Sequence, residues 1–315
     1  MTRAESNIVL FSITLCWASS YIFIKNLPED LSSFAYMTIT SGIAGIILAL
    51  VFSRRLHELH WKLLQRSLVM AVVICAAMVF EHLGINALSS ASMASFLASL
   101  NIVFVPLFML LLKRMPTKNN VAGIVVILCG LVLTSGVYAG QPLEAGAIYI
   151  IIECMFMALY IIIVDSFTKQ FDPLLLGIGQ MFFTTLLAFL IWCLEEQRTF
   201  FALNYTREML ANIFLLAFFA RAYAYIMLMY GQKYANPISV TVIASTEPVV
   251  TMFLAILIPG TYGVGESFSL TRLIGAICIV IGAIIAGTDF LERLRLPQLR
   301  RIKALRNCKQ RSGFP

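Results

Sequence analysis

The segment NIVLFSITLCWASSYIFIKN, residues 7–26, indicates the architecture of the chain. Lys25 is its only charged residue. Because about 20 apolar residues in an α-helix cross the ~30 Å hydrocarbon core of a bilayer, the segment predicts a transmembrane helix. Nine further stretches have a similar length and composition: 32–53, 67–86, 91–112, 119–139, 145–165, 174–194, 210–230, 237–258 and 270–290. The sequence therefore predicts an all-α membrane protein with ten transmembrane helices.

The composition of the whole chain agrees with this class. Of 315 residues, 60% are hydrophobic and 12% are charged, and the mean hydropathy is +0.89. Soluble domains usually contain about 25% charged residues, so a soluble enzyme, a disordered chain and a secreted disulfide scaffold are excluded. Seven cysteines without a CxxC pair are expected to be apolar filler. The N-terminus has no small-residue cleavage site before residue 7, so we expect the first helix to be retained.

The basic residues predict the orientation of the chain. With the N-terminus inside the cell, 18 of the 23 Lys and Arg residues fall on the cytoplasmic side, four fall outside and Arg221 lies within a span. Both termini are then cytoplasmic, in the cell membrane. The basic tail, residues 291–315, is expected to touch anionic lipid and not nucleic acid.

An internal repeat divides the chain into residues 7–139 and 145–290. The Gly123-x6-Gly130 spacing near the end of the first half recurs as Gly275-x6-Gly282 in the second. These glycines favour close helix packing or a homodimer. Five helices per repeat place the two halves in opposite orientations, which is an arrangement of secondary transporters with a site between the halves.

Several stretches resemble EamA-type proteins of the drug/metabolite transporter superfamily. They are Trp17–Lys25, Ser92–Leu97 with Phe104-Val105-Pro106, Ser245–Val249, and the glycine-spaced fifth and tenth spans. The resemblance covers about residues 7–290. It implies a ten-helix, inverted-repeat carrier of small metabolites that works by alternating access. Many members have an arginine in the second span, which residues 36–41 lack, so no preference for anionic substrates is carried over.

Five ionisable residues inside the predicted spans are functional candidates, because ionisable groups are costly in a membrane. They are Glu81, His82, Glu153, Arg221 and Glu247. Glu81, His82 and Glu153 are candidates for proton coupling, although Glu81 or His82 could instead reach the outer surface. Arg221 needs an acidic partner, and we expect a structural ion pair with Glu247, at a similar depth in its helix. No three-ligand metal site or cofactor motif is recognised, so neither a metal nor a cofactor is expected.

Aromatic side chains accompany these groups. Trp17 and Tyr21 share one helix face, and Glu153 shares another with Tyr160, where tyrosine rings can help hold an ammonium group. A packing stripe with a protonated Glu153, and an interfacial Tyr36, remain open alternatives. The expected substrate-binding residues are Trp17, Tyr21, Tyr36, Glu81, Glu153, Tyr160, Gln180, Arg221 and Tyr225.

The leading hypothesis is a secondary transporter of a small polar metabolite, cationic or zwitterionic, because the interior contains three acids and one arginine. A carrier of an anionic metabolite that uses Arg221 is one alternative. A channel is another. An intramembrane enzyme is the third, although no HExxH, GxSxG or Walker motif occurs. Pro106 and Pro248 lie inside spans and should kink them, as hinges of a carrier would require.

Overall fold

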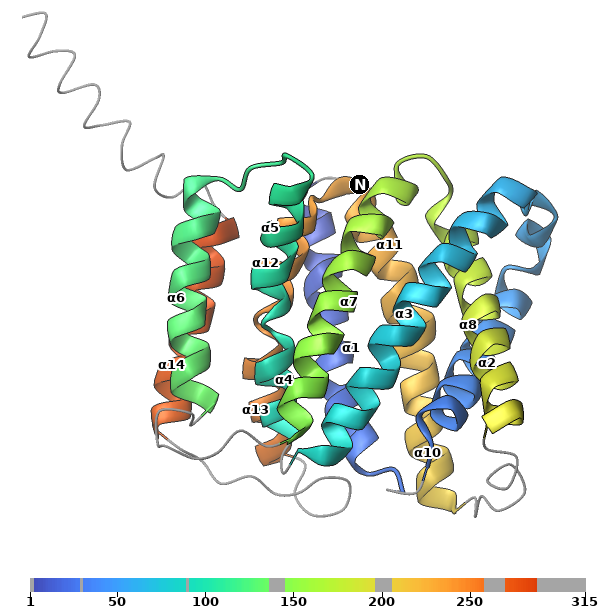
Figure 1. Cartoon of the computed structure of the whole chain (residues 1–315), viewed down its shortest axis with the longest axis horizontal. Coiled ribbons are helices and arrows are strands. Elements are labelled where there is room, and N and C mark those ends of the chain that lie inside the picture. The colour runs from blue at the N-terminus through green and yellow to red at the C-terminus, as the bar shows by residue number, and fades with distance from the viewer. Residues whose placement is uncertain are drawn as a thin grey trace, which may run out of the picture.

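The chain folds into a bundle of long helices that lie side by side (Figure 1). This computed structural model describes residues 3–28, 31–88, 91–135, 145–195, 206–257 and 270–287. The predicted tail, residues 291–315, lies outside them. All the regular elements in the described part are helical: α1 (Arg3–Lys25), α2 (Ser33–Val51), η1 (Ser53–Glu58), α3 (Trp61–Ala87), α4 (Ala91–Ala98), α5 (Asn101–Leu111), α6 (Lys118–Ser135), α7 (Ala145–Thr168), α8 (Pro173–Glu195), α10 (Arg207–Leu215), η3 (Leu216–Tyr223), α11 (Ala224–Tyr234), α12 (Pro237–Ala244), α13 (Glu247–Leu257) and α14 (Leu270–Gly287).

The all-α membrane class predicted from the sequence is confirmed. Eight helical segments of the described residues are long and apolar enough to cross a bilayer. Two shorter apolar helices, Lys118–Leu133 and Leu273–Ala286, lie where the fifth and tenth spans are expected. The count of ten spans and the two-repeat topology stay predictions.

Two of the predicted spans are broken in the middle. The span predicted over 91–112 forms α4 and α5, and that over 237–258 forms α12 and α13. At both breaks the backbone tightens to i→i−3 hydrogen bonds, from Val103 to Leu100 and from Val249 to Thr246. Pro248 lies in the first turn of α13, directly after the break. Proline favours such a break because it has no N–H to donate and its ring clashes with the preceding turn. Pro106 lies inside α5, about two turns after the other break.

A third irregularity lies between α10 and α11. Residues Leu216–Tyr223 form a π-helical segment, η3, within one continuous helical run from Arg207 to Tyr234. π-Helical segments are rare in proteins, and those that do occur often lie at functional sites. This one contains Arg221, the arginine predicted to lie inside a span.

The glycines of the repeated motif join α6 to α14, the pair at the left of Figure 1. Gly123 faces the Gly282 backbone and Gly130 faces the Gly275 backbone. The close helix packing predicted for these glycines therefore occurs within one chain. A homodimer stays a prediction, and these glycines no longer support it.

We expect Gly123→Ala to destabilise the protein, because its new Cβ would lie 2.5 Å from both the Gly282 carbonyl oxygen and the Ala286 Cβ. Overpacking of this kind typically costs about 1–3 kcal/mol. Thermal unfolding of the protein in detergent would show a lower midpoint. Gly45→Ala is the control, since its Cβ would make only an ordinary 3.8 Å contact with Met181. An equal loss in both variants would contradict the α6–α14 packing.

Candidate functional site

Arg221 lies at the centre of a cluster of polar side chains inside the bundle. Its side chain is only 3% exposed, and one of its terminal nitrogens, Nη2, lies 3.5 Å from Glu81 Oε2. The same nitrogen donates to the Tyr36 hydroxyl at 2.5 Å, and Nη1 donates to the Tyr225 hydroxyl at 3.2 Å. The guanidinium also lies over both tyrosine rings, 5.4 and 5.7 Å from their centroids. Side chains from three helices, α2, α3 and α11, therefore stabilise its positive charge.

The predicted ion pair between Arg221 and Glu247 is wrong. The acidic partner of Arg221 is Glu81. The reason is helix packing: η3 packs mainly on α1 and α2, whereas α13, which begins at Glu247, packs on α1, α4 and α14. Glu247 instead interacts with the Tyr21 hydroxyl.

Three carboxyl groups share the interior with this one arginine. The Glu81 side chain is 15% exposed, and Glu153 and Glu247 are 4% and 7% exposed. Glu153 lies close enough to the other two glutamates for their charges to interact. Its Oε2 atom is buried and has no hydrogen-bond partner in the described part of the chain. Among the described residues, Arg221 is the only Lys or Arg that is buried, so the cluster has an excess of acid.

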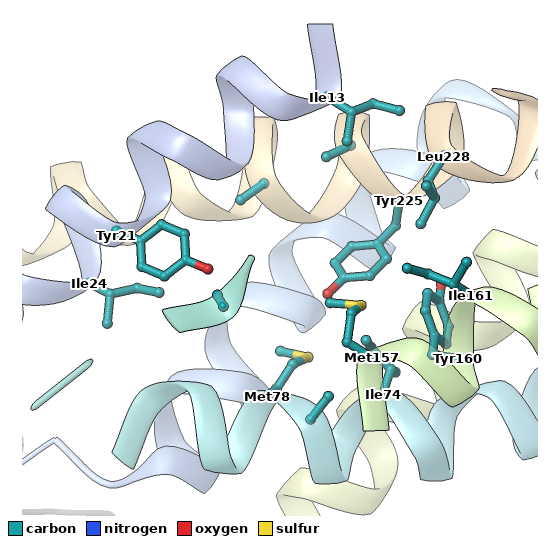
Figure 2. Close-up of a cluster of buried hydrophobic side chains, with 14 of the residues drawn as sticks. Ile13, Tyr21, Ile24, Ile74, Met78, Met157, Tyr160, Ile161, Tyr225 and Leu228 are labelled. Carbon is teal, nitrogen blue, oxygen red and sulfur yellow. The ribbon is translucent and has the colours of Figure 1, made fainter. Parts of the chain in front are cut away.

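Figure 2 shows buried aromatic and sulfur-containing side chains of the bundle interior, among them Tyr225, which contacts Arg221. There the Tyr21 and Tyr225 phenols point toward one another, with Met78 and Met157 close by. Trp17 and Tyr160 each meet the Tyr225 ring edge to face, with centroids 6.0 and 5.9 Å apart. This aromatic wall brings together four of the residues predicted to bind substrate.

Gln180 and Tyr160 form a second polar contact beside the wall. The Tyr160 hydroxyl donates to Gln180 Oε1 at 2.8 Å. Gln180 Nε2 is buried and has no hydrogen-bond partner among the described residues.

His82 faces away from the acids, since adjacent residues on a helix point about 100° apart. Its Nδ1 atom lies 3.0 Å from the Ser33 hydroxyl, and its Nε2 atom lies 3.4 Å from the Asn86 amide nitrogen. The imidazole stacks on the Tyr36 ring at 4.8 Å. In this position His82 supports Tyr36, which is buried and not an interfacial anchor.

Sequence reasoning missed the contacts that join the broken helices to their neighbours. Cys154, expected to be apolar filler, lies next to Glu153, and its Sγ atom is 3.4 and 3.2 Å from the carbonyl oxygens of Leu97 and Ala98 in α4. The Thr251 hydroxyl of α13 lies 3.0 Å from the Ser95 hydroxyl of α4. The available signal was the presence of small hydroxyl residues, such as Ser95 and Thr251, in the two spans that contain Pro106 and Pro248. Among the described residues, no group of three potential ligands could hold a metal ion.

We expect Glu81→Gln to lower the free energy of unfolding by about 3–5 kcal/mol, because it leaves a buried guanidinium without its counter-charge. Unfolding of the purified protein by heat or by SDS measures the loss. Glu247→Gln is the matched control, since this carboxyl group is buried and makes no ion pair with Arg221. The double variant Glu81→Gln/Arg221→Met should recover part of the stability. A greater loss for Glu247→Gln would contradict the assigned pair.

Comparisons with known proteins agree with this architecture. The EamA-like transporter family matches residues 6–136 and 144–288. An uncharacterized transporter of Archaeoglobus fulgidus is 23% identical over 286 residues, which cover 90% of this chain and 86% of the relative. A crystal structure of another protein superposes with a TM-score of 0.70 at 18% identity, covering 93% of this chain and 99% of the other, and shows the fold alone. Because the family match covers most of the chain, the protein belongs to the EamA-like transporter family, as its sequence motifs predicted.

Proposed function

We propose that this membrane transporter carries a small organic amine or zwitterion, such as an amino-acid-like metabolite, by alternating access. Its family makes it a transporter and not an enzyme. The observation that supports the substrate class is the charge balance of the interior. The interior contains three buried carboxyl groups and one buried guanidinium, and that guanidinium already has Glu81 as its partner. A cationic group of the substrate would balance the remaining acid.

Glu153 is the residue that we assign to the cationic group. Its Oε2 atom is buried without a hydrogen-bond partner from the residues that the structure describes, although a buried polar atom normally has one. Tyr160 lies seven residues further along α7, on the same helix face, and its ring meets Tyr225. An ammonium group at Glu153 would therefore gain charge pairing and a cation–π contact together. Glu247, with Tyr21 beside it, forms the second acidic position.

A carboxylate on the same substrate would have two donors available. Arg221 Nε and Gln180 Nε2 are buried and find no hydrogen-bond partner within the described ranges. These atoms favour a zwitterion over a simple amine. They are also the basis for the second candidate, an anionic metabolite. That candidate is weaker, because an anionic group could pair with the Arg221 guanidinium only by displacing Glu81.

Alternating access would use the two broken helices as hinges. Discontinuous helices in corresponding positions of two repeats are a pointer to the binding site of a transporter. The breaks at residues 99–100 and 245–246 fall in corresponding parts of the two halves. Proton exchange, if it drives transport, is assigned to Glu81 and Glu153. His82 is assigned to positioning Tyr36, because both its ring nitrogens have partners.

The proposed orientation places η1 and the start of α6 on the cytoplasmic side. Exposed basic residues gather at this end of the bundle: Arg54, Lys62, Arg66, Lys113, Arg114 and Lys118. A cytoplasmic excess of Lys and Arg is the rule in multi-pass membrane proteins. Both termini would then lie in the cytoplasm.

A screen of ligand classes tests the charge of the substrate. We expect choline or glycine at millimolar concentration to raise the thermal midpoint of the purified protein and acetate to have no effect. A ligand at 100 times its Kd stabilises the folded state by about 2.7 kcal/mol. Stabilisation by acetate or inorganic phosphate alone would contradict the proposal and move the site to Arg221.

Transport in proteoliposomes tests the role of Glu153. The transported substrate is choline or glycine, whichever of the two binds. We expect Glu153→Gln to reduce its counterflow about tenfold to a hundredfold, because a hydrogen bond to a charged group contributes ~1.5–3 kcal/mol. Glu208→Gln removes an exposed carboxyl group in the first turn of α10 and should transport normally. Unchanged transport by folded Glu153→Gln would exclude the assigned role.

A further inference from the structure

A hollow lies on the outside of the bundle, between α2 and α8, away from the Arg221 cluster. It is a groove of about 580 Å³, and none of the residues of the Arg221 cluster lines it. Gly42, Gly45 and Ala49 share one face of α2 and leave the space open. Ile46 and Phe182 at its edge are 62% and 60% exposed, so the groove faces lipid in a membrane.

The groove has the length of one lipid leaflet. Its lining on α2 runs from Thr38 to Ala49, and its lining on α8 runs from Ile178 to Phe189. Eleven residue steps of helix measure about 16 Å on each side. This is about half of the ~30 Å hydrocarbon core, the depth that one acyl chain fills.

One end of the groove lies at the basic side of the protein. Leu56 of η1 and Leu64 of α3 line that end. Arg54 and Lys62 belong to the same two elements, η1 and α3, and both are exposed and form no ion pair with the described residues. The neighbouring Arg55 is already occupied, because it pairs with Glu58 at 2.6 Å and with Asp172 at 3.5 Å.

Two further features keep this end electropositive. The hydrogen bond from Arg55 lowers the pKa of the Glu58 carboxyl group, so that these two residues stay paired and leave Arg54 and Lys62 uncompensated. The first turn of α3 begins at Trp61, and its N-cap, His60, makes no side-chain cap hydrogen bond. The N-terminal end of α3 adds partial positive charge beside Lys62.

We propose that this groove binds one anionic phospholipid, with an acyl chain along α2 and α8 and its phosphate at Arg54 and Lys62. The apolar walls provide affinity for any acyl chain. The uncompensated positive charge at one end provides selectivity for a negative headgroup. A zwitterionic lipid would bring a quaternary ammonium close to the same two basic residues and bind less well.

The test uses the full-length protein, purified in detergent and stripped of lipid. Dioleoyl phosphatidylglycerol, dioleoyl phosphatidylcholine and inorganic phosphate are added in separate titrations. Bound lipid is counted by native mass spectrometry, and the thermal midpoint is measured in parallel. We expect one tightly bound phosphatidylglycerol, at least tenfold tighter than phosphatidylcholine, and no midpoint shift with phosphate. Equal binding of the two lipids, or the same shift with phosphate alone, would overturn the proposal.

Variants separate the headgroup contact from general electrostatics. Arg54→Gln/Lys62→Gln should abolish the preference for phosphatidylglycerol. Lys118→Gln/Lys233→Gln removes two exposed charges at the start of α6 and the end of α11 and should preserve the preference. An equal loss in both double variants would mean non-specific attraction and contradict the site.

A second set of variants tests the groove itself. Ala49→Phe should block the acyl chain and remove the bound lipid, with the smaller Ala49→Leu as the variant to use if the first does not fold. Val125→Phe, at a 55% exposed position of α6, is the control for added bulk. Lipid retained by folded Ala49→Leu and Ala49→Phe would overturn the proposal. A native mass spectrum showing that Ala49→Phe disrupts a dimer would also overturn the proposal, because the groove would then be an interface between two copies of the chain.

Discussion

A guanidinium buried in a membrane protein must be given a counter-charge and hydrogen-bond acceptors, and the centre of this molecule is arranged around that requirement. Arg221 obtains the charge from Glu81 and its acceptors from Tyr36 and Tyr225. These partners connect α2, α3 and α11. Because Glu81 is used in this way, Glu153 remains an acid without a basic partner among the described residues.

Irregular backbone accompanies this buried charge. In a bilayer, non-helical backbone is tolerated where it is buried in protein, since its polar groups need partners there. The interruption after α4 is next to α7, where Cys154 lies within hydrogen-bonding distance of two α4 carbonyl oxygens. Thr251 and Ser95 join the broken helices of the two halves. The site and the breaks in the helices are therefore parts of one interior, which is what a moving carrier would need.

Much of the fold could be predicted from the sequence, because a transmembrane helix requires only about 20 consecutive apolar residues. Of the residues expected to bind substrate, Trp17 and Tyr160 both contact the Tyr225 ring in the structure, and their role in binding stays a prediction. The acidic partner of Arg221 could not be predicted. The depth of a residue along its helix can be read from the sequence, but the identity of the neighbouring helices cannot. The π segment around Arg221 contains no proline or glycine, and nothing in its sequence signals the irregularity.

The central claim is that Arg221 is neutralised within the protein and that the remaining acid binds a cationic group. A cryo-electron microscopy structure with the most stabilising ligand bound tests this most directly. We predict a ligand beside Tyr225 with its positive group at Glu153, while the contact between Arg221 and Glu81 persists. A ligand whose negative group takes the place of Glu81 at Arg221 would contradict the account.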